Sequence, residues 1–154
     1  MHLSRLSDYA VALMTYIARH PERVHTVANV AAATRVPVPT VAKLLAKLRH
    51  NGLLASTRGV KGGYALVRPP AAISVTEIVA VLDGPIALTN CIGAGHGSCD
   101  IEEVCPSRLG LHRINLAVRK VLDDISLADI ASPVSAAPQA APQADARLHS
   151  HALP

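Results

Sequence analysis

The sequence lacks the features that mark membrane proteins, secreted proteins and the common enzyme classes. None of its apolar runs reaches the eighteen or so residues that a helix needs to cross a bilayer. Residues 1–20 do not read as a signal peptide, because Asp8 and Arg19 interrupt the apolar pattern and no A-x-A cleavage site follows. There is no P-loop and no G-x-S-x-G sequence, and the histidines have no evident nucleophile to activate. We therefore expect a cytoplasmic protein that is not an enzyme.

Acidic residues are missing from one long stretch in the first half of the chain. The whole sequence has 15 lysines and arginines against 11 aspartates and glutamates, a formal charge of only +4. Residues 35–68 contain no aspartate or glutamate, and their basic residues are Arg35, Lys43, Lys47, Arg49, Arg58, Lys61 and Arg68. Such a segment predicts contact with a polyanion, although a basic face that meets only solvent has the same composition.

The first 83 residues predict a mainly α fold with a small β-hairpin wing. Apolar residues spaced three and four apart indicate a helix from about Ser7, a second helix capped by Thr26 and a third from about Pro39. Two alternating segments then flank the glycine-rich stretch 58–63, which is typical of a β-hairpin. Two helices joined by a tight turn and followed by a basic hairpin indicate a winged helix-turn-helix.

Basic residues gather on one face of the third predicted helix and at the tip of the hairpin. Thr40, Lys43 and Lys47 line the side of the helix opposite a complete apolar stripe, and Arg58 and Lys61 lie in the hairpin turn. In this fold the second helix of the pair enters the major groove of double-stranded DNA. We therefore expect these five side chains to contact DNA, the alternative being that they are solvated surface positions.

All three cysteines lie within fifteen residues, in a glycine-rich stretch that has neither a helical nor a strand period. The residues around Cys91, Cys99 and Cys105 are too polar and too flexible to form a core, so three thiolates in one loop indicate a metal ion or an iron–sulfur cluster. Two alternatives stay open. One is a zinc-stabilised or thiol-redox-sensing transcription factor, and the other, from a different class, is an iron–sulfur carrier or scaffold protein.

The second half of the chain predicts a dimerisation helix and a tail. After a helix capped by Ser74 and Glu77, residues 84–106 form the cysteine-rich loop, 107–130 one long helix and 131–154 a disordered tail rich in alanine and proline. Five apolar residues form a narrow seam of coiled-coil type along the long helix: Leu111, Ile114, Val118, Val121 and Ile125. We expect this seam to form a homodimer interface, the alternative being that it packs on its own chain.

Four stretches together resemble the Rrf2 family of bacterial transcription regulators, which includes the iron–sulfur regulators IscR and NsrR. They are residues 6–10 (LSDYA), 48–53 (LRHNGL), 58–66 (RGVKGGYAL) and the three-cysteine loop, and the likeness spans about residues 1–130. It is greatest to regulators of the SUF iron–sulfur assembly operon. The resemblance implies a dimeric winged-helix repressor or activator of iron–sulfur assembly or stress genes, whose affinity for a palindromic operator depends on a 2Fe-2S or 4Fe-4S cluster.

The chain departs from the family pattern at two places. IscR-like and NsrR-like proteins space their cysteines as C-x5-C-x5-C, whereas here the first gap holds residues 92–98. Three thiolates leave one cluster position for another ligand. The resemblance implies Asp8 from the partner chain or, less favoured, a histidine such as His112. Ala42 stands where IscR carries a glutamate, so we expect a different operator.

Overall fold

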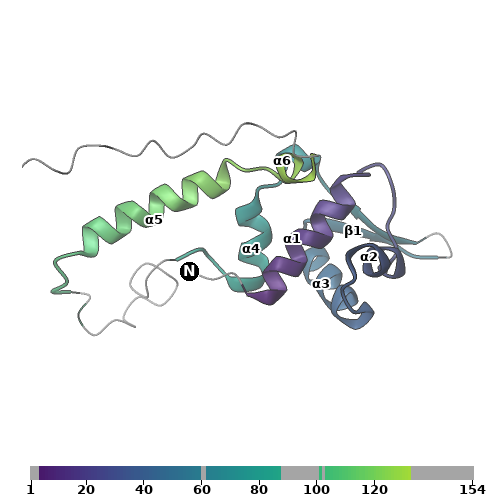
Figure 1. The fold of residues 1–154 in the computed structure, drawn as a ribbon, viewed down its shortest axis with the longest axis horizontal. Coiled ribbons are helices and arrows are strands. Elements are labelled where there is room, and N and C mark those ends of the chain that lie inside the picture. Colours follow the sequence, from purple (N-terminus) through teal and green to yellow (C-terminus); the bar gives the residue numbers. More distant parts are fainter. Residues whose placement is uncertain (1–3, 60–61, 88–100, 102, 133–154) are drawn as a thin grey trace, which may run out of the picture.

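Helices dominate the computed structural model, which describes residues 4–59, 62–87, 101 and 103–132. The described elements are α1 (Arg5–Ala18), α2 (Val27–Thr34), α3 (Val38–His50), β1 (Leu54–Thr57), β2 (Gly63–Leu66), a 3-10 helix η1 (Pro70–Ala72), α4 (Val75–Asp83), α5 (Arg108–Asp123) and α6 (Leu127–Ala131). Helices α1 to α4 and the hairpin pack together, while α5 extends away from them (Figure 1). The predicted mainly α fold with a hairpin wing is confirmed. In the described residues, no helix combines the length and apolarity that crossing a membrane requires.

Helix α1 lies at the centre of the core. Four of its apolar residues are fully buried, and the helix contacts α2, α3, α4 and α6. The helix begins at Arg5, where the hydroxyl of Ser4 caps it by accepting a hydrogen bond from the Ser7 amide at 3.1 Å. The predicted start near Ser7 is therefore one turn late. Ser7 itself is fully buried, and its hydroxyl donates a hydrogen bond to the Asp83 carboxylate at the end of α4.

The helix-turn-helix consists of α2 and α3, as predicted. Thr26 caps α2 by accepting a hydrogen bond from the Asn29 amide at 3.1 Å. The turn passes through Arg35, which has a left-handed backbone with φ of 56°. Helix α3 then buries Val41, Leu44, Leu45 and Leu48 against the core, so its opposite face is left exposed.

The wing is an antiparallel hairpin held at its base by the segment that precedes α2. Strands β1 and β2 pair with Leu54 opposite Leu66 and Thr57 opposite Gly63. His25 and Tyr64 exchange two backbone hydrogen bonds of 2.8 Å, so β2 is paired on both sides. A Cβ atom at Gly63 would lie 2.5 Å from the His25 carbonyl oxygen, which makes glycine necessary at that position.

The prediction of one long helix over residues 107–130 is wrong in one respect, because the structure divides this stretch into α5 and α6. Ser126 starts α6 with a capping box, in which Asp129 accepts a hydrogen bond from the Ser126 amide at 2.9 Å. The same segment pairs with the residues before α4, since the Leu127 amide donates to the Ile73 carbonyl at 2.7 Å. Helix α6 therefore packs on α1 and η1 and belongs to the core of the DNA-binding part.

The tail predicted for 131–154 overlaps the end of α6. Ala131 is buried at the end of α6, and Ser132 follows it. Residues 133–154, on which the rest of that prediction falls, lie outside the described residues.

Because Leu127 is fully buried, replacing it should test whether α6 is part of the core. We expect Leu127→Ala to lower the free energy of unfolding by about 2–5 kcal/mol through lost burial and the cavity it leaves. Val67→Ala, at an exposed position, is the control and should cost about 0.5 kcal/mol or less. Urea unfolding of both variants measures the difference, and equal costs would contradict the assignment of α6 to the core.

Candidate nucleic-acid interface and candidate metal centre

The candidate DNA-contacting residues lie on the exposed side of α3 and beside the wing. Lys43 and Lys47 are exposed on α3, Thr40 is half-buried, and Arg58 is exposed directly after β1. Lys61 lies outside the described residues. No carboxylate that the structure describes forms an ion pair with Lys43 or Arg58. Their charges are therefore available to an external anion.

The first turn of α3 is also favourable for an anion. It contains no acidic residue, and the N-cap residue Pro37 supplies no side-chain hydrogen bond to the free amides of that turn. Free amides and the positive end of the helix dipole both favour negative charge. The basic residues of the helix and its amino end therefore act in the same direction.

Lys47 of α3 also contacts the end of α4. Its ammonium donates a hydrogen bond to the Leu82 carbonyl oxygen at 3.5 Å. The adjacent Asp83 accepts hydrogen bonds from the Ser4 amide at 3.0 Å and from the Ser7 hydroxyl at 2.7 Å. Hydrogen bonding from Ser4 is the largest cause that holds the pKa of Asp83 below its usual value near 3.8, and Ser7 and Lys47 lower that pKa further. We call Asp83, Ser4, Ser7 and Lys47 the Asp83 junction.

Only one of the three cysteines lies among the described residues. Cys105 is a half-buried free thiol just before α5, and its carbonyl oxygen accepts a hydrogen bond from the Arg108 amide at 3.3 Å. Cys91 and Cys99 lie outside the described residues. Within the described part, no three histidine, cysteine or acidic side chains gather into a metal site. The geometry of the proposed metal centre is therefore not part of the described structure.

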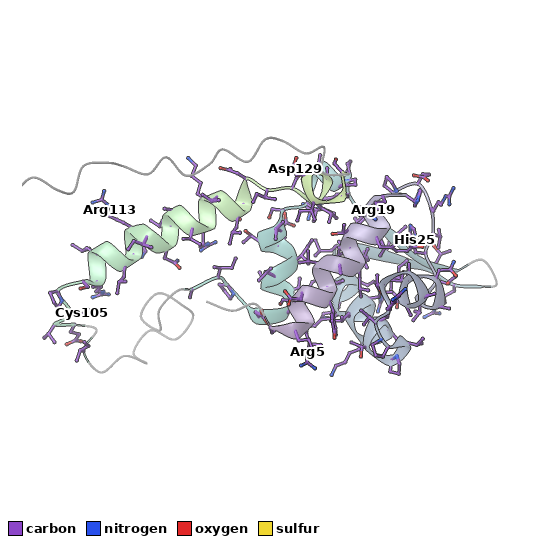
Figure 2. All side chains as sticks on the ribbon, viewed as in Figure 1. Arg5, Arg19, His25, Cys105, Arg113 and Asp129 are labelled. Carbon is purple, nitrogen blue, oxygen red and sulfur yellow. The ribbon has the colours of Figure 1, made fainter. Side chains whose placement is uncertain are left out.

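The two candidates for a further ligand lie on different helices. Asp8 is exposed in the first turn of α1, and His112 is exposed on α5, one turn from its start. Figure 2 shows Cys105 beyond the outer end of α5, far from Arg5, where α1 begins. Asp8 therefore does not lie beside Cys105 of the same chain, and as a ligand it would have to come from another copy.

The predicted seam of the long helix is covered along only one of its edges. Leu111 and Val118 are half-buried, on the same side of α5 as the buried Asn115. Ile114 and Val121 are 53% and 61% exposed, and Ile125, which follows α5, is 36% exposed. Part of the seam is thus covered within the chain, and an apolar face remains uncovered.

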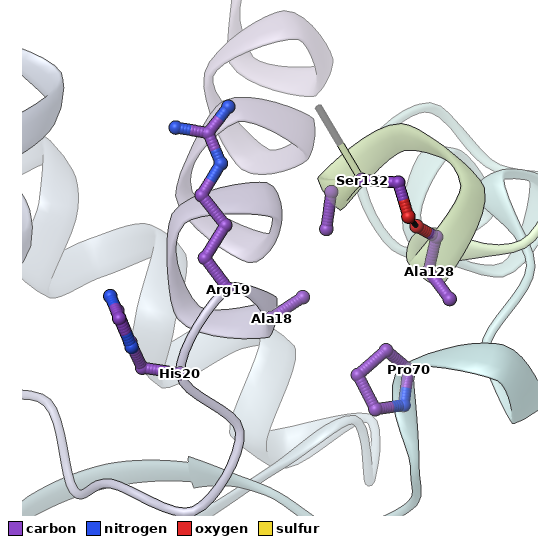
Figure 3. A pocket seen from close by; sticks show the side chains of 7 residues that line it. Ala18, Arg19, His20, Pro70, Ala128 and Ser132 are labelled. Carbon is purple, nitrogen blue, oxygen red and sulfur yellow. Dashed lines mark hydrogen bonds between the residues drawn. The ribbon is translucent and has the colours of Figure 1, made fainter. Parts of the chain in front are cut away.

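A cavity of about 640 Å³ lies at the opposite end of α1 from Ser4. Small side chains from α1, η1 and α6 line much of it (Figure 3), and the full lining is Ala18, Arg19, His20, Pro70, Ala128, Ala131 and Ser132. None of the candidate DNA or metal residues lines this cavity.

The Asp83 junction is the feature that the sequence patterns miss. Ser7 and Asp83 are 76 residues apart, so no local spacing brings them together. The one available sign is Ser7 itself, a polar residue on the apolar face of α1, because a buried hydroxyl needs a hydrogen-bond partner.

Known proteins resemble this chain over most of its length. The Rrf2 family model, described as an iron-dependent transcriptional regulator, matches residues 3–133. The regulator NsrR of Geobacillus kaustophilus is 28% identical over 84% of this chain and 89% of its own length. The structure of CymR, the global cysteine regulator of B. subtilis, is 31% identical, covers 85% of this chain and 96% of that one, and superposes with a TM-score of 0.70. T. potens IscR is 28% identical over 84% and 85% of the two chains, with a TM-score of 0.65.

Proposed function

Since the chain belongs to the Rrf2 family of iron-dependent transcriptional regulators, we propose that it binds its operator as a homodimer whose affinity depends on an iron–sulfur cluster. DNA binding and transcriptional regulation follow from the family itself. The observation that carries the proposal is the place of the three cysteines in the chain. They lie between α4, which contacts α1 and α3, and α5, which has an uncovered apolar face.

The DNA-binding face consists of α3 and the wing. Helix α3 enters the major groove, where Thr40 and Lys43 reach base edges and phosphates. Arg58 and Lys61 of the wing contact the neighbouring DNA backbone or minor groove. Lys43 and Arg58 form no ion pair with a carboxylate in the described part of the chain, and this and the open amino end of α3 support the assignment.

The homodimer forms through α5. Ile114, Val121 and Ile125 expose an apolar strip, which a second copy buries in a two-fold interface together with Leu111 and Val118. Two copies of α3 then meet the half-sites of a palindromic operator, roughly 34 Å apart.

Cys91, Cys99 and Cys105 hold the cluster, because cysteine thiolates are the usual ligands of iron–sulfur clusters. Asp8 of a second copy supplies the further ligand in preference to His112, since Asp8 is exposed at the start of α1 and Cys105 lies away from it in the same chain. When bound, the cluster supplies iron that responds to oxidants, nitric oxide or iron supply. The genes controlled are those of SUF-type iron–sulfur assembly or of stress responses, as the sequence resemblance implies.

A cluster-free thiol switch is the second candidate. The likeness to CymR, a global cysteine regulator, favours it, and a zinc-stabilised form would use the same three thiolates. An iron–sulfur carrier, in contrast, has no use for the winged helix-turn-helix, and family membership gives that alternative no support.

Removing a charge from the proposed groove-facing side of α3 tests the DNA-binding face. We expect Lys43→Ala to weaken binding to all DNA sequences and to reduce the slope of log affinity against log salt concentration by about 1 per protomer. Lys120→Ala, exposed on α5, should leave both quantities unchanged. Fluorescence anisotropy across a salt series measures this, and identical slopes for the two variants would count against α3 as the contact.

Charge on the uncovered face of α5 tests the dimer. The double variant Ile114→Asp, Val121→Asp should be monomeric, because burying two carboxylates costs far more than the apolar contacts return. Arg113→Asp is the control and should remain dimeric, since Arg113 lies outside the three- and four-residue spacing of the apolar strip on α5. Sedimentation velocity gives the mass directly. A dimeric double variant would show that α5 is not the interface.

Anaerobic isolation with iron and sulfide analysis tests the cofactor. The wild-type chain should be coloured and contain both elements, and the variant with Cys91, Cys99 and Cys105 all replaced by serine should contain neither. Asp8→Ala should retain iron but lose it faster to a chelator, whereas Asp123→Ala on α5 should behave as wild type. A colourless wild-type protein with zinc, or with no metal at all, would instead favour the second candidate.

A further inference from the structure

The Asp83 junction joins three elements that the proposed regulation has to connect. Asp83 is the last residue of α4, Ser4 and Ser7 belong to the start of α1, and Lys47 belongs to α3. Figure 1 shows the end of α4 beside the start of α1, and both helices contact α3. One carboxylate therefore lies where the recognition helix, the central helix and the exit from α4 meet.

The contacts at the junction are specific. A single oxygen of Asp83 accepts hydrogen bonds from both the Ser7 hydroxyl, at 2.7 Å, and the Ser4 amide, at 3.0 Å. Ser7 is fully buried, so its hydroxyl has no water to replace Asp83 as a partner. Hydrogen bonds to an ionised carboxylate are shorter and stronger than neutral ones, and the lowered pKa of Asp83 agrees with that assignment.

In the sequence, the Asp83 junction also lies next to the cysteine segment and to Asp8, the proposed further ligand. Gly84 ends α4 with a positive φ of 81°, and the chain then runs through residues 85–87 towards Cys91. Asp8 follows Ser7 directly in α1. A shift in the last turn of α4 would therefore act on the cysteine segment and on the start of α1 at once.

Lys47 provides the connection to DNA. Its ammonium is held at the Leu82 carbonyl oxygen and near the Asp83 carboxylate, yet it is exposed on α3. The ammonium has three N–H donors, so it can stay bound to the end of α4 while it donates to a phosphate. Its position thus depends on where α4 ends.

We propose that Asp83 is a positioning residue which, through Ser7 and Lys47, couples the cysteine-bearing segment to the recognition helix α3. This inference rests on the proposed function, since it explains how occupation of the cysteines reaches DNA. Two sites coupled in this way typically change each other's affinity by about 5-fold or more. The sites are the three cysteines and the DNA face, and the junction supplies a contiguous set of contacts between α4 and α3.

The test is the ratio of operator affinities of the full chain in its iron-loaded and iron-free forms. The operator is selected from a random DNA library by the wild-type protein. We expect a wild-type ratio of about 5-fold or more, and a ratio below about 2-fold in Asp83→Asn, which keeps the shape of the side chain but loses its charge. Ser7→Ala, which removes the buried donor, should reduce the ratio in the same way.

Asp129→Asn is the matched control. Asp129 also accepts hydrogen bonds from a helix-capping serine, Ser126, and its pKa is also lowered, but it lies in α6, which packs on α1 and η1. Its affinity ratio should equal that of wild type. Iron content and the melting temperature of each form are measured in parallel, because a merely structural role would lower stability without changing the ratio.

Each outcome decides the inference. A normal ratio in both Asp83→Asn and Ser7→Ala overturns it, and so does an equal loss in Asp129→Asn, which would mean that the loss is not specific to the Asp83 junction. If Asp83→Asn fails to fold, the nearly isosteric Ser7→Ala decides alone. A wild-type ratio of one, in contrast, overturns the proposed cluster dependence itself, and this result appears before any variant is made.

Discussion

Burial of one face of α1 is the constraint on which the other contacts depend. Ala10, Leu13, Met14 and Ile17 are fully buried and meet apolar residues from α2, α3, α4 and α6. Because α1 is shared by all of these helices, its two ends become the places where distant segments meet. Asp83 of α4 docks at its amino end, and α6 packs near its carboxyl end, so the chain is anchored to one helix before the cysteine segment and again after α5.

This anchoring suits a protein whose regulatory and DNA-binding parts lie in one short chain. The basic face of α3 is held by its buried leucines, while α5 extends outwards with apolar residues uncovered. The cysteine segment lies in the chain between the helix that touches α3 and the helix that we propose to form the dimer. In the proposed dimer, occupation of the cysteines would therefore act on the spacing of the two α3 helices through a short stretch of chain.

Local chemistry made most of the fold predictable from the sequence. Thr26 and Ser74 cap their helices where the patterns placed them, and two paired strands lie on either side of the glycine-rich turn, as predicted. The break before α6 was missed because the apolar seam continues to Ile125, while the capping box at Ser126 is stabilised by pairing with residues near Ser74. Asp83 was missed because its partners lie 76 and 79 residues away. Tertiary contacts of this kind leave no periodic signal.

We propose that thiolate-held iron and sulfide set the affinity of this regulator for its operator. The test is the operator dissociation constant of anaerobically isolated wild-type protein, measured before cluster removal, after it, and again after reconstitution. We expect a change of about 5-fold or more that reconstitution reverses. An unchanged dissociation constant in protein that demonstrably gained and lost iron and sulfide would contradict it.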